Sequence, residues 1–222
     1  MIREKVVKSL KDFPLFTTEF GLASLILKEI PYRGVAFVTI RDVQEGQFAE
    51  HLAECVSFCR MVGAERIYAK GHDALESYPL HCIVYKMSMA LQQRQPEANL
   101  WPVTEETVSQ WREIYNKAMR PFDNHATMTS GDEKRIIGSG GAYFVHRSGE
   151  LLGIGWMEGN ELLALVSVVP GMGETVARTL FTTVDADMIT LDVVSTNERA
   201  IRLYERMGFV KTGEVSRWYR VL

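Results

Sequence analysis

The sequence contains few cysteines, no long apolar run and no strong excess of charge of either sign. Its three cysteines, Cys55, Cys59 and Cys82, are an odd number and lack the paired spacing of a zinc site, so we expect reduced, buried thiols and no metal. No apolar stretch is long enough to cross a bilayer, and the segment Met1–Lys8 is too charged for a secretory leader. We therefore expect a cytoplasmic protein without a membrane partner.

The charge balance excludes a further class of partner. Lysines and arginines total 25 and acidic residues total 28, which gives a formal net charge of −3. A chain with this balance has no electrostatic reason to bind nucleic acid. Nucleic-acid binding is therefore not expected, and the sequence leaves the oligomeric state open.

The length of the chain and one polar segment indicate two domains. The 222 residues, 46% of them apolar, are enough for one large domain or two small ones. The segment Gln92–Asn99 is polar, lacks periodicity and contains a proline, which is typical of a linker or domain edge. We predict a first domain over residues 1–95 and a second over residues 96–222.

Strand and helix patterns alternate in both halves of the chain. In the second half, the turns Ser148–Glu150 and Glu158–Asn160 separate three strands of a predicted meander. The predicted elements of the first half are strands over 21–30, 34–42, 65–69 and 80–89 and a helix over 47–62; those of the second are strands over 100–103, 142–147, 151–157 and 162–169 and helices over 104–119, 131–137 and 174–184.

The segment from Ile189 to Gly213 is the most informative part of the chain. Residues 188–194 are rich in β-branched and apolar types, which predicts a strand covered on both faces. A helix follows, which Ser195, Thr196 or Asn197 can cap and which Gly208 ends. Its predicted apolar face consists of Ala200, Ile201, Tyr204 and Met207.

The run Asn197-x-x-Ala200-x-x-Leu203-Tyr204-x-x-x-Gly208-Phe209 resembles the helix-and-strand signature near the C-terminus of the GNAT N-acetyltransferase superfamily. The resemblance implies an α/β fold with a mixed, mostly antiparallel central sheet. It also implies that an acetyl-CoA thioester lies between two parallel strands splayed apart at their ends. Tyr204 would then be the acid that protonates the leaving thiolate, whereas a simple core position is the alternative for a helical tyrosine.

The order of elements in the second half is that of a complete GNAT domain, and the first half resembles the later part of one. The resemblance thus implies a tandem of one truncated and one complete copy. Nothing in the first half matches the tyrosine signature. We therefore expect the first half to be scaffold and pocket wall.

The loop Pro170–Thr175 joins a predicted strand directly to a predicted helix. Glycines at such a junction let backbone N–H groups point outward together, and the helix N-terminus adds partial positive charge, so a pyrophosphate would bind well. The loop resembles the family's phosphate loop, but Val168 stands where the family has arginine or glutamine. This departure puts tight CoA binding in doubt, and an ordinary turn with a helix cap is the alternative.

The resemblance further implies that the strand before this loop pairs with the pantetheine arm and polarises the thioester carbonyl. It implies that Asn197 helps to hold the cofactor. The predicted contacts to acetyl-CoA are Val166, Ser167, Val168, Gly171, Met172, Gly173, Glu174, Thr175 and Asn197.

Acetyl transfer to an amine also requires a base, because only the uncharged amine is a nucleophile. Glu161 is the first candidate, since the family often places its carboxylate at the start of this strand. Glu158, His146 and Asp192 are alternatives, and each of the four can instead be a solvated strand end. The irregular segment Arg120–His125 lies where the family often shapes its acceptor pocket.

The predicted function is N-acetyl transfer from acetyl-CoA, by direct attack, to an amine of a small molecule. A small acceptor is expected because no acidic or basic run suggests a protein tail or nucleic acid. Two alternatives remain at this point. One is a non-catalytic acyl-CoA-binding or regulatory module, and the other is a scaffold whose cofactor site is dead.

Overall fold

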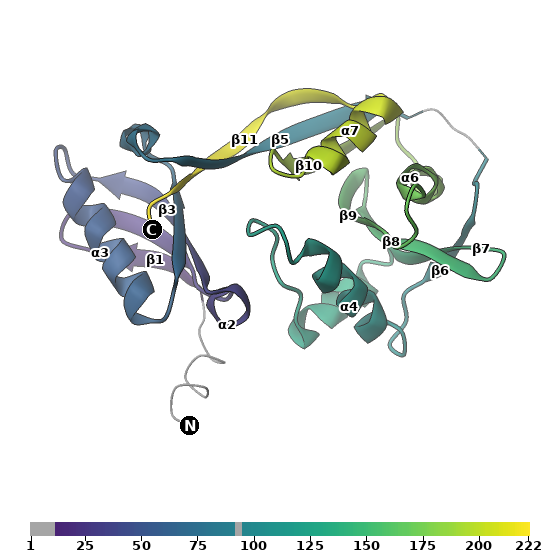
Figure 1. Cartoon of the computed structure of the whole chain (residues 1–222), viewed down its shortest axis with the longest axis horizontal. Helices are drawn as coiled ribbons and strands as arrows, with labels where there is room; N and C mark the ends of the chain where they lie inside the picture. The colour runs from purple at the N-terminus through teal and green to yellow at the C-terminus, as the bar shows by residue number, and fades with distance from the viewer. Residues whose placement is uncertain (1–11, 92–94) are drawn as a thin grey trace. The chain divides into compact units, whose positions relative to one another are not determined.

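The computed structural model describes residues 12–91 and 95–222, which form two compact units (Figure 1). One unit contains the described residues up to Ile83 together with Ser216–Leu222, and the other is Val84–Val215. Two strands, β5 (Leu80–Ala90) and β11 (Val210–Arg220), each run from one unit into the other. The units thus divide within these strands. The expected domains 1–95 and 96–222 stay a prediction, and part of the linker on which they rest lies outside the described residues.

The first unit is a sheet with one helix packed on it, in the strand order β1-β2-β3-β4-β11. Strands β3 and β4 are parallel, from Val35↔Arg66 to Thr39↔Lys70. The strands and long helix predicted for this half are present, but the structure adds β1 and α2, and the strand predicted over 21–30 ends at Ile26. The elements are β1 (Phe13–Thr17), β2 (Gly21–Ile26), α2 (Ile30–Arg33), β3 (Val35–Val43), α3 (Phe48–Met61), β4 (Arg66–Lys70) and a 3₁₀ turn, η1 (Asp73–Ser77).

Helix α3 buries one face against this sheet. Its fully buried positions include His51, Cys55 and Cys59, spaced four residues apart on one side of the helix. Burial raises the pKa of both thiols to about 12, and that of Cys82 to about 11. All three cysteines are free and buried, as the sequence predicts.

The second unit is a sheet with the strand order β11-β5-β10-β9-β8-β7-β6. Its neighbours from β5 to β6 pair antiparallel except β9 and β10, which are parallel. This is the mixed, mostly antiparallel sheet that the sequence predicts. The elements are β6 (Asn99–Pro102), α4 (Val108–Met119), η2 (Ser130–Asp132), α5 (Glu133–Gly138), β7 (Ala142–Arg147), β8 (Glu150–Glu158), β9 (Glu161–Ser167), α6 (Gly173–Phe181), β10 (Met188–Val194) and α7 (Glu198–Met207).

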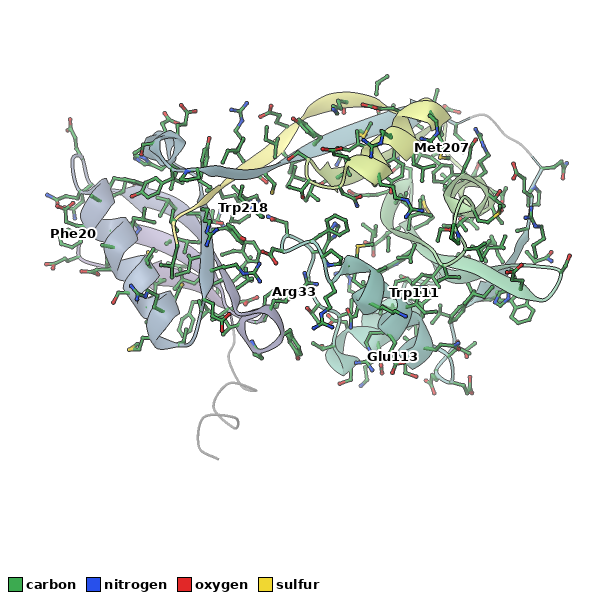
Figure 2. The ribbon with its side chains drawn as sticks, in the orientation of Figure 1. Phe20, Arg33, Trp111, Glu113, Met207 and Trp218 are labelled. Carbon is green, nitrogen blue, oxygen red and sulfur yellow. The ribbon has the colours of Figure 1, made fainter. Side chains whose placement is uncertain are left out.

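Helices cover this second sheet on both faces (Figure 1). On one face, α6 and α7 bury residues such as Leu180 and Met207 against Leu191 of β10. On the other face, α4 buries Trp111, whose indole Nε1 donates to the Tyr143 carbonyl at 3.1 Å. Figure 2 labels Met207 and Trp111 on these two groups of helices. Among the described residues, no helix is long and apolar enough to span a bilayer.

A β-bulge at Leu163 bends β9 at the point where its pairing with β10 ends. On β8, Met157 pairs with Leu162 and Trp156 pairs with Ala164, so Leu163 has no partner there. The bulge reverses the faces, because Leu162 packs in the α6–α7 core whereas Ala164 packs in the α4–α5 core. Its register with β10 consists of Thr190↔Glu161 and Leu191↔Leu162. Beyond these pairs the two parallel strands diverge.

Gly153 of β8 lies close to both β9 and α6. A Cβ at this position would overlap the Val166 backbone oxygen and lie 2.9 Å from Val176 Cγ2. We expect Gly153→Ala to lower the free energy of unfolding by about 1–3 kcal/mol, because an overpacked core must shift its backbone. Thermal unfolding measures this loss. The control Gly138→Ala, with no atom within 4 Å of the new Cβ, should be near neutral, and an equal loss in both variants would contradict the steric reason.

Candidate functional site

Helix α7 begins and ends as its sequence predicts. Of the three candidate caps, Asn197 is the one used, since its side-chain oxygen accepts from the Ala200 N–H at 3.2 Å. Gly208, with φ 102°, supplies the left-handed residue that ends the helix. The cap uses the oxygen of Asn197 as an acceptor, and its side-chain N–H₂ group is the donor that it can offer a ligand.

Tyr204 lies on the buried face of α7. Its ring is 5.5 Å from that of Phe209, and 8% of the residue is exposed. Burial raises the pKa of the phenol above its ordinary value, so the group carries its proton at neutral pH. Tyr204 is therefore a core residue with a protonated phenol, and it lines two adjoining cavities.

The larger cavity, of about 510 Å³, lies among β9, α4, α6 and α7. The smaller, of about 50 Å³, lies between β9 and β10 where the strands diverge. Both cavities share Met119, Leu165, Asn197, Ala200 and Tyr204 in their walls, which places the phenol at their junction. The splayed pair thus opens an elongated site within the second unit.

The strand-to-helix loop forms one end of the larger cavity. Gly171 adopts φ 83°, a conformation that other residues rarely take, and α6 begins at Gly173. The N–H groups of Gly173, Glu174 and Thr175 find no backbone or side-chain acceptor among the described residues. Such unpaired first-turn N–H groups, with the helix dipole behind them, suit an anion.

Positive charge reaches this cavity from α7 and not from the loop. Val168 is 43% exposed and brings no charge, and its N–H donates to the Leu152 carbonyl at 2.9 Å. Arg199, Arg202 and Arg206 line the cavity instead, three and four residues apart along α7. In the sequence these arginines belong to the polar face of the helix, and nothing in their spacing alone assigns them to a site.

One carboxylate also lines the larger cavity, but its charge is compensated. Arg178 binds Glu174 Oε1 through Nη2 at 2.7 Å and Nε at 2.8 Å. Such a paired contact from one guanidinium offsets the negative charge at the start of α6. Arg202 is in turn paired with Glu198 at 3.0 Å, so the net positive lining of the cavity comes from Arg199 and Arg206.

Six of the nine predicted cofactor contacts line the larger cavity. Of the other three, Val168 is solvent-exposed, Met172 precedes α6 with its sulfur 3.3 Å from Arg147 Nη2, and Thr175 donates to Glu97 Oε2 at 2.9 Å. The lining residues are Val166, Ser167, Gly171, Gly173, Glu174 and Asn197.

The four candidate bases lie in different surroundings. Glu161 begins β9 outside both cavities and pairs with Lys86 Nζ at 3.6 Å. Glu158 pairs with Arg135 at 3.6 Å, and His146 stacks on Trp101 with ring centroids 4.3 Å apart. Asp192 is the only one of the four candidates that lines the smaller cavity.

The predicted acceptor segment Arg120–His125 contributes one residue to each cavity. Phe122 lines the larger and His125 the smaller. Their rings are 5.8 Å apart in an edge-on arrangement. No group of three or more His, Cys, Asp or Glu side chains suited to a metal is found within residues 12–91 and 95–222.

Several solved structures resemble this chain in fold. A functionally unknown conserved protein from Staphylococcus epidermidis matches with a TM-score of 0.60 at 9% identity, covering 92% of this chain and 91% of its own. A GCN5-related N-acetyltransferase from Sphaerobacter thermophilus matches with a TM-score of 0.54 at 13% identity, covering 90% and 75%. A tandem GNAT protein from the clavulanic acid biosynthesis pathway matches with a TM-score of 0.51 at 15% identity, covering 90% and 78%.

No protein-family model and no curated protein matches the sequence. The likeness is one of structure, and it shows that the chain has the fold of the GNAT superfamily. The fold that the segment Asn197–Phe209 predicts for this chain is thereby confirmed.

Proposed function

We propose that this protein, with its GNAT fold, is an N-acetyltransferase that transfers an acetyl group from acetyl-CoA to an amine of a small molecule. One observation carries the proposal. The phenol of Tyr204 lies at the junction of two cavities, one with an anion-binding end and one between diverging parallel strands. A long thioester with a phosphorylated end and a reactive end matches this arrangement.

The residues present fit acetyl-CoA at its phosphorylated end. The unpaired N–H groups of Gly173, Glu174 and Thr175 would hold the pyrophosphate, and the arginine stripe of α7 would supply the charge that Val168 does not. Gly173 also lets the first turn of α6 lie close to α7, because a Cβ there would lie 3.1 Å from Leu203 Cδ2.

The strand edge fits the pantetheine arm. The N–H of Val168 points toward β8, where it donates to Leu152, and N–H directions alternate along a strand. After the bulge, Leu165 and Ser167 therefore direct their backbone groups to the side from which β10 has diverged. An extended pantetheine would pair with this free edge as a peptide pairs with an edge strand.

The roles of this chain's residues follow from their placement. Bound acetyl-CoA supplies an activated acetyl carbon. The backbone N–H on the free edge of β9 would polarise the carbonyl oxygen, a contribution worth about 3–4 kcal/mol in comparable sites. Tyr204, protonated because it is buried, would give its proton to the departing sulfur.

A thermal-shift titration tests the binding half of this proposal. Acetyl-CoA at about 100 times its dissociation constant should raise the free energy of unfolding by about 2.7 kcal/mol. For a chain of this size, that corresponds to an increase in Tm of roughly 5–10 °C. Adenosine, which has the base but no phosphate, is the control. No shift with acetyl-CoA would reject the proposal and favour a scaffold with a dead site.

A turnover assay tests the catalytic half. Release of the CoA thiol in the presence of a panel of primary amines should depend on both the protein and the amine. The absence of a cationic side chain at Val168 motivates the second candidate, a non-catalytic acyl-CoA-binding or regulatory module. Thermal stabilisation by acetyl-CoA without turnover across the panel would favour this second candidate.

A further inference from the structure

The small cavity passes through the sheet where β9 and β10 have diverged. Tyr204 reaches its wall from α7 on one face, and Tyr115 reaches it from α4 on the other. Leu162–Leu165 of β9 and Val193 of β10 form its edges. A thioester held in the gap would thus be accessible from both faces of the sheet.

Asp192 lies on the α4 face of this gap. Its neighbours Leu191 and Val193 are buried in the α6–α7 core, and side chains alternate along a strand. The carboxylate of Asp192 therefore points to the face opposite α7, from which Tyr204 comes. Among the described residues, it is the one carboxylate in the wall of the small cavity.

A lysine on the neighbouring strand accompanies this carboxylate. Lys86 of β5 is directly opposite Asp192 in the antiparallel register, and its Nζ lies 3.5 Å from Asp192 Oδ1. The same Nζ lies 3.6 Å from Glu161 Oε1. At a distance of 3.5 Å, the Lys86 contact leaves lone pairs of the Asp192 carboxylate for another donor. His125 is the other titratable group, besides the two tyrosines, in the cavity wall.

We propose that Asp192 is the group that binds the acceptor as an alkylammonium ion and removes its proton, on the face of the sheet opposite Tyr204. This inference rests on the proposed acetyl transfer and gives it a substrate class, an alkylamine that is protonated at neutral pH. An ammonium is a natural partner for the carboxylate at the cavity wall. Glu161, the base expected from the sequence, shares Lys86 but lies outside the cavity.

The proposed step balances in atoms and charge. Asp192 takes one proton from the ammonium and passes it to solvent. The nitrogen lone pair then forms a bond to the acetyl carbon as the carbon–sulfur bond breaks. The sulfur takes the phenol proton of Tyr204, and the second proton lost by the nitrogen restores the phenol. The products are one amide, one CoA thiol and one released proton.

The test compares Asp192→Asn with wild type on two amine classes. With n-butylamine, kcat/KM should fall about 100-fold, which is the usual contribution of a positioned base. With aniline, which is uncharged at neutral pH, the loss should be less than about 10-fold, because no proton has to be removed before attack. A purely structural role of Asp192 would lower both rates equally and overturn the inference.

Two further variants isolate the site. Glu161→Gln also removes one of the two carboxylates that pair with Lys86. If it lowers kcat/KM for n-butylamine more than Asp192→Asn does, the inference is overturned in favour of Glu161. Asp187→Asn, an aspartate exposed ahead of the same strand, is the matched surface control and should behave as wild type.

A readout without turnover completes the test. In NMR spectra of the free protein, the carboxyl carbon signal of Asp192 should shift on addition of n-butylamine at neutral pH, whereas n-butanol should leave it in place. If the wild type acetylates alkylamines and Asp192→Asn does so at the full rate, the inference is rejected but the proposed function stands. Absence of turnover by the wild type with every amine would reject the proposed function and the inference together.

Discussion

Replacing Tyr204 with phenylalanine is expected to slow thiol release about 100-fold, and up to about 10,000-fold, while acetyl-CoA binds with nearly unchanged affinity. The phenol lies at the junction of the two cavities, and burial keeps it protonated. Without its proton, the sulfur must leave as a free thiolate. Stopped-flow or steady-state thiol release measures the rate, and calorimetry measures the affinity.

The control for this prediction is Tyr143→Phe. Tyr143 lies on β7 outside both cavities, so its hydroxyl should not affect the rate. The raised pKa of Tyr204 also predicts how the rate depends on pH. Because ionisation of Tyr204 occurs above its ordinary value of about 10, the wild-type rate should not decline through this group between about pH 7 and 9.5. An unchanged rate in Tyr204→Phe would remove the acid role.

Replacing Gly173 with aspartate is expected to weaken acetyl-CoA binding at least about 100-fold, or about 2.7 kcal/mol. Gly173 opens α6, where the N–H groups of the first turn have no acceptor among the described residues. A carboxylate there would repel a phosphate about 5 Å away by about 3 kcal/mol per unit charge near a protein surface. Calorimetry of acetyl-CoA binding measures the loss.

The same substitution should leave the unliganded protein stable or slightly more stable. A negative charge in the first turn of a helix is favourable, by about 0.3–1 kcal/mol. The matched variant Gly173→Asn has the same shape without the charge, so it measures the steric contribution of the contact with Leu203 Cδ2 at 3.1 Å. Equal affinity losses in the two variants would contradict binding of a phosphate at this helix end.

The predicted segment around α7 illustrates how much local sequence can determine. The cap at Asn197, the apolar stripe that contains Tyr204 and the stop at Gly208 depend on neighbours within four residues. The strand-to-helix glycines at 171 and 173 likewise act through local backbone freedom. For these reasons, the helix, the loop and the fold that they signal could be predicted without the structure.

The choice among carboxylates could not be predicted in this way. Glu161 and Asp192 both stand on strands of polar and apolar residues, and either could face a pocket. Their surroundings depend on which strands pair and on the bulge at Leu163, which reverses the faces of β9. Pairing over such distances in the chain is not encoded by residue spacing.

The sequence by itself thus determined most of the helices and strands of this protein, though not β1 and α2, together with the position of its tyrosine and the glycine junction before α6. The tertiary structure decided where β9 and β10 separate, which carboxylate reaches the gap, and that three arginines of α7 line the larger cavity. Caps and stripes act over one or two turns of helix. A cavity forms only when residues distant in sequence meet, so its walls follow from pairing and packing.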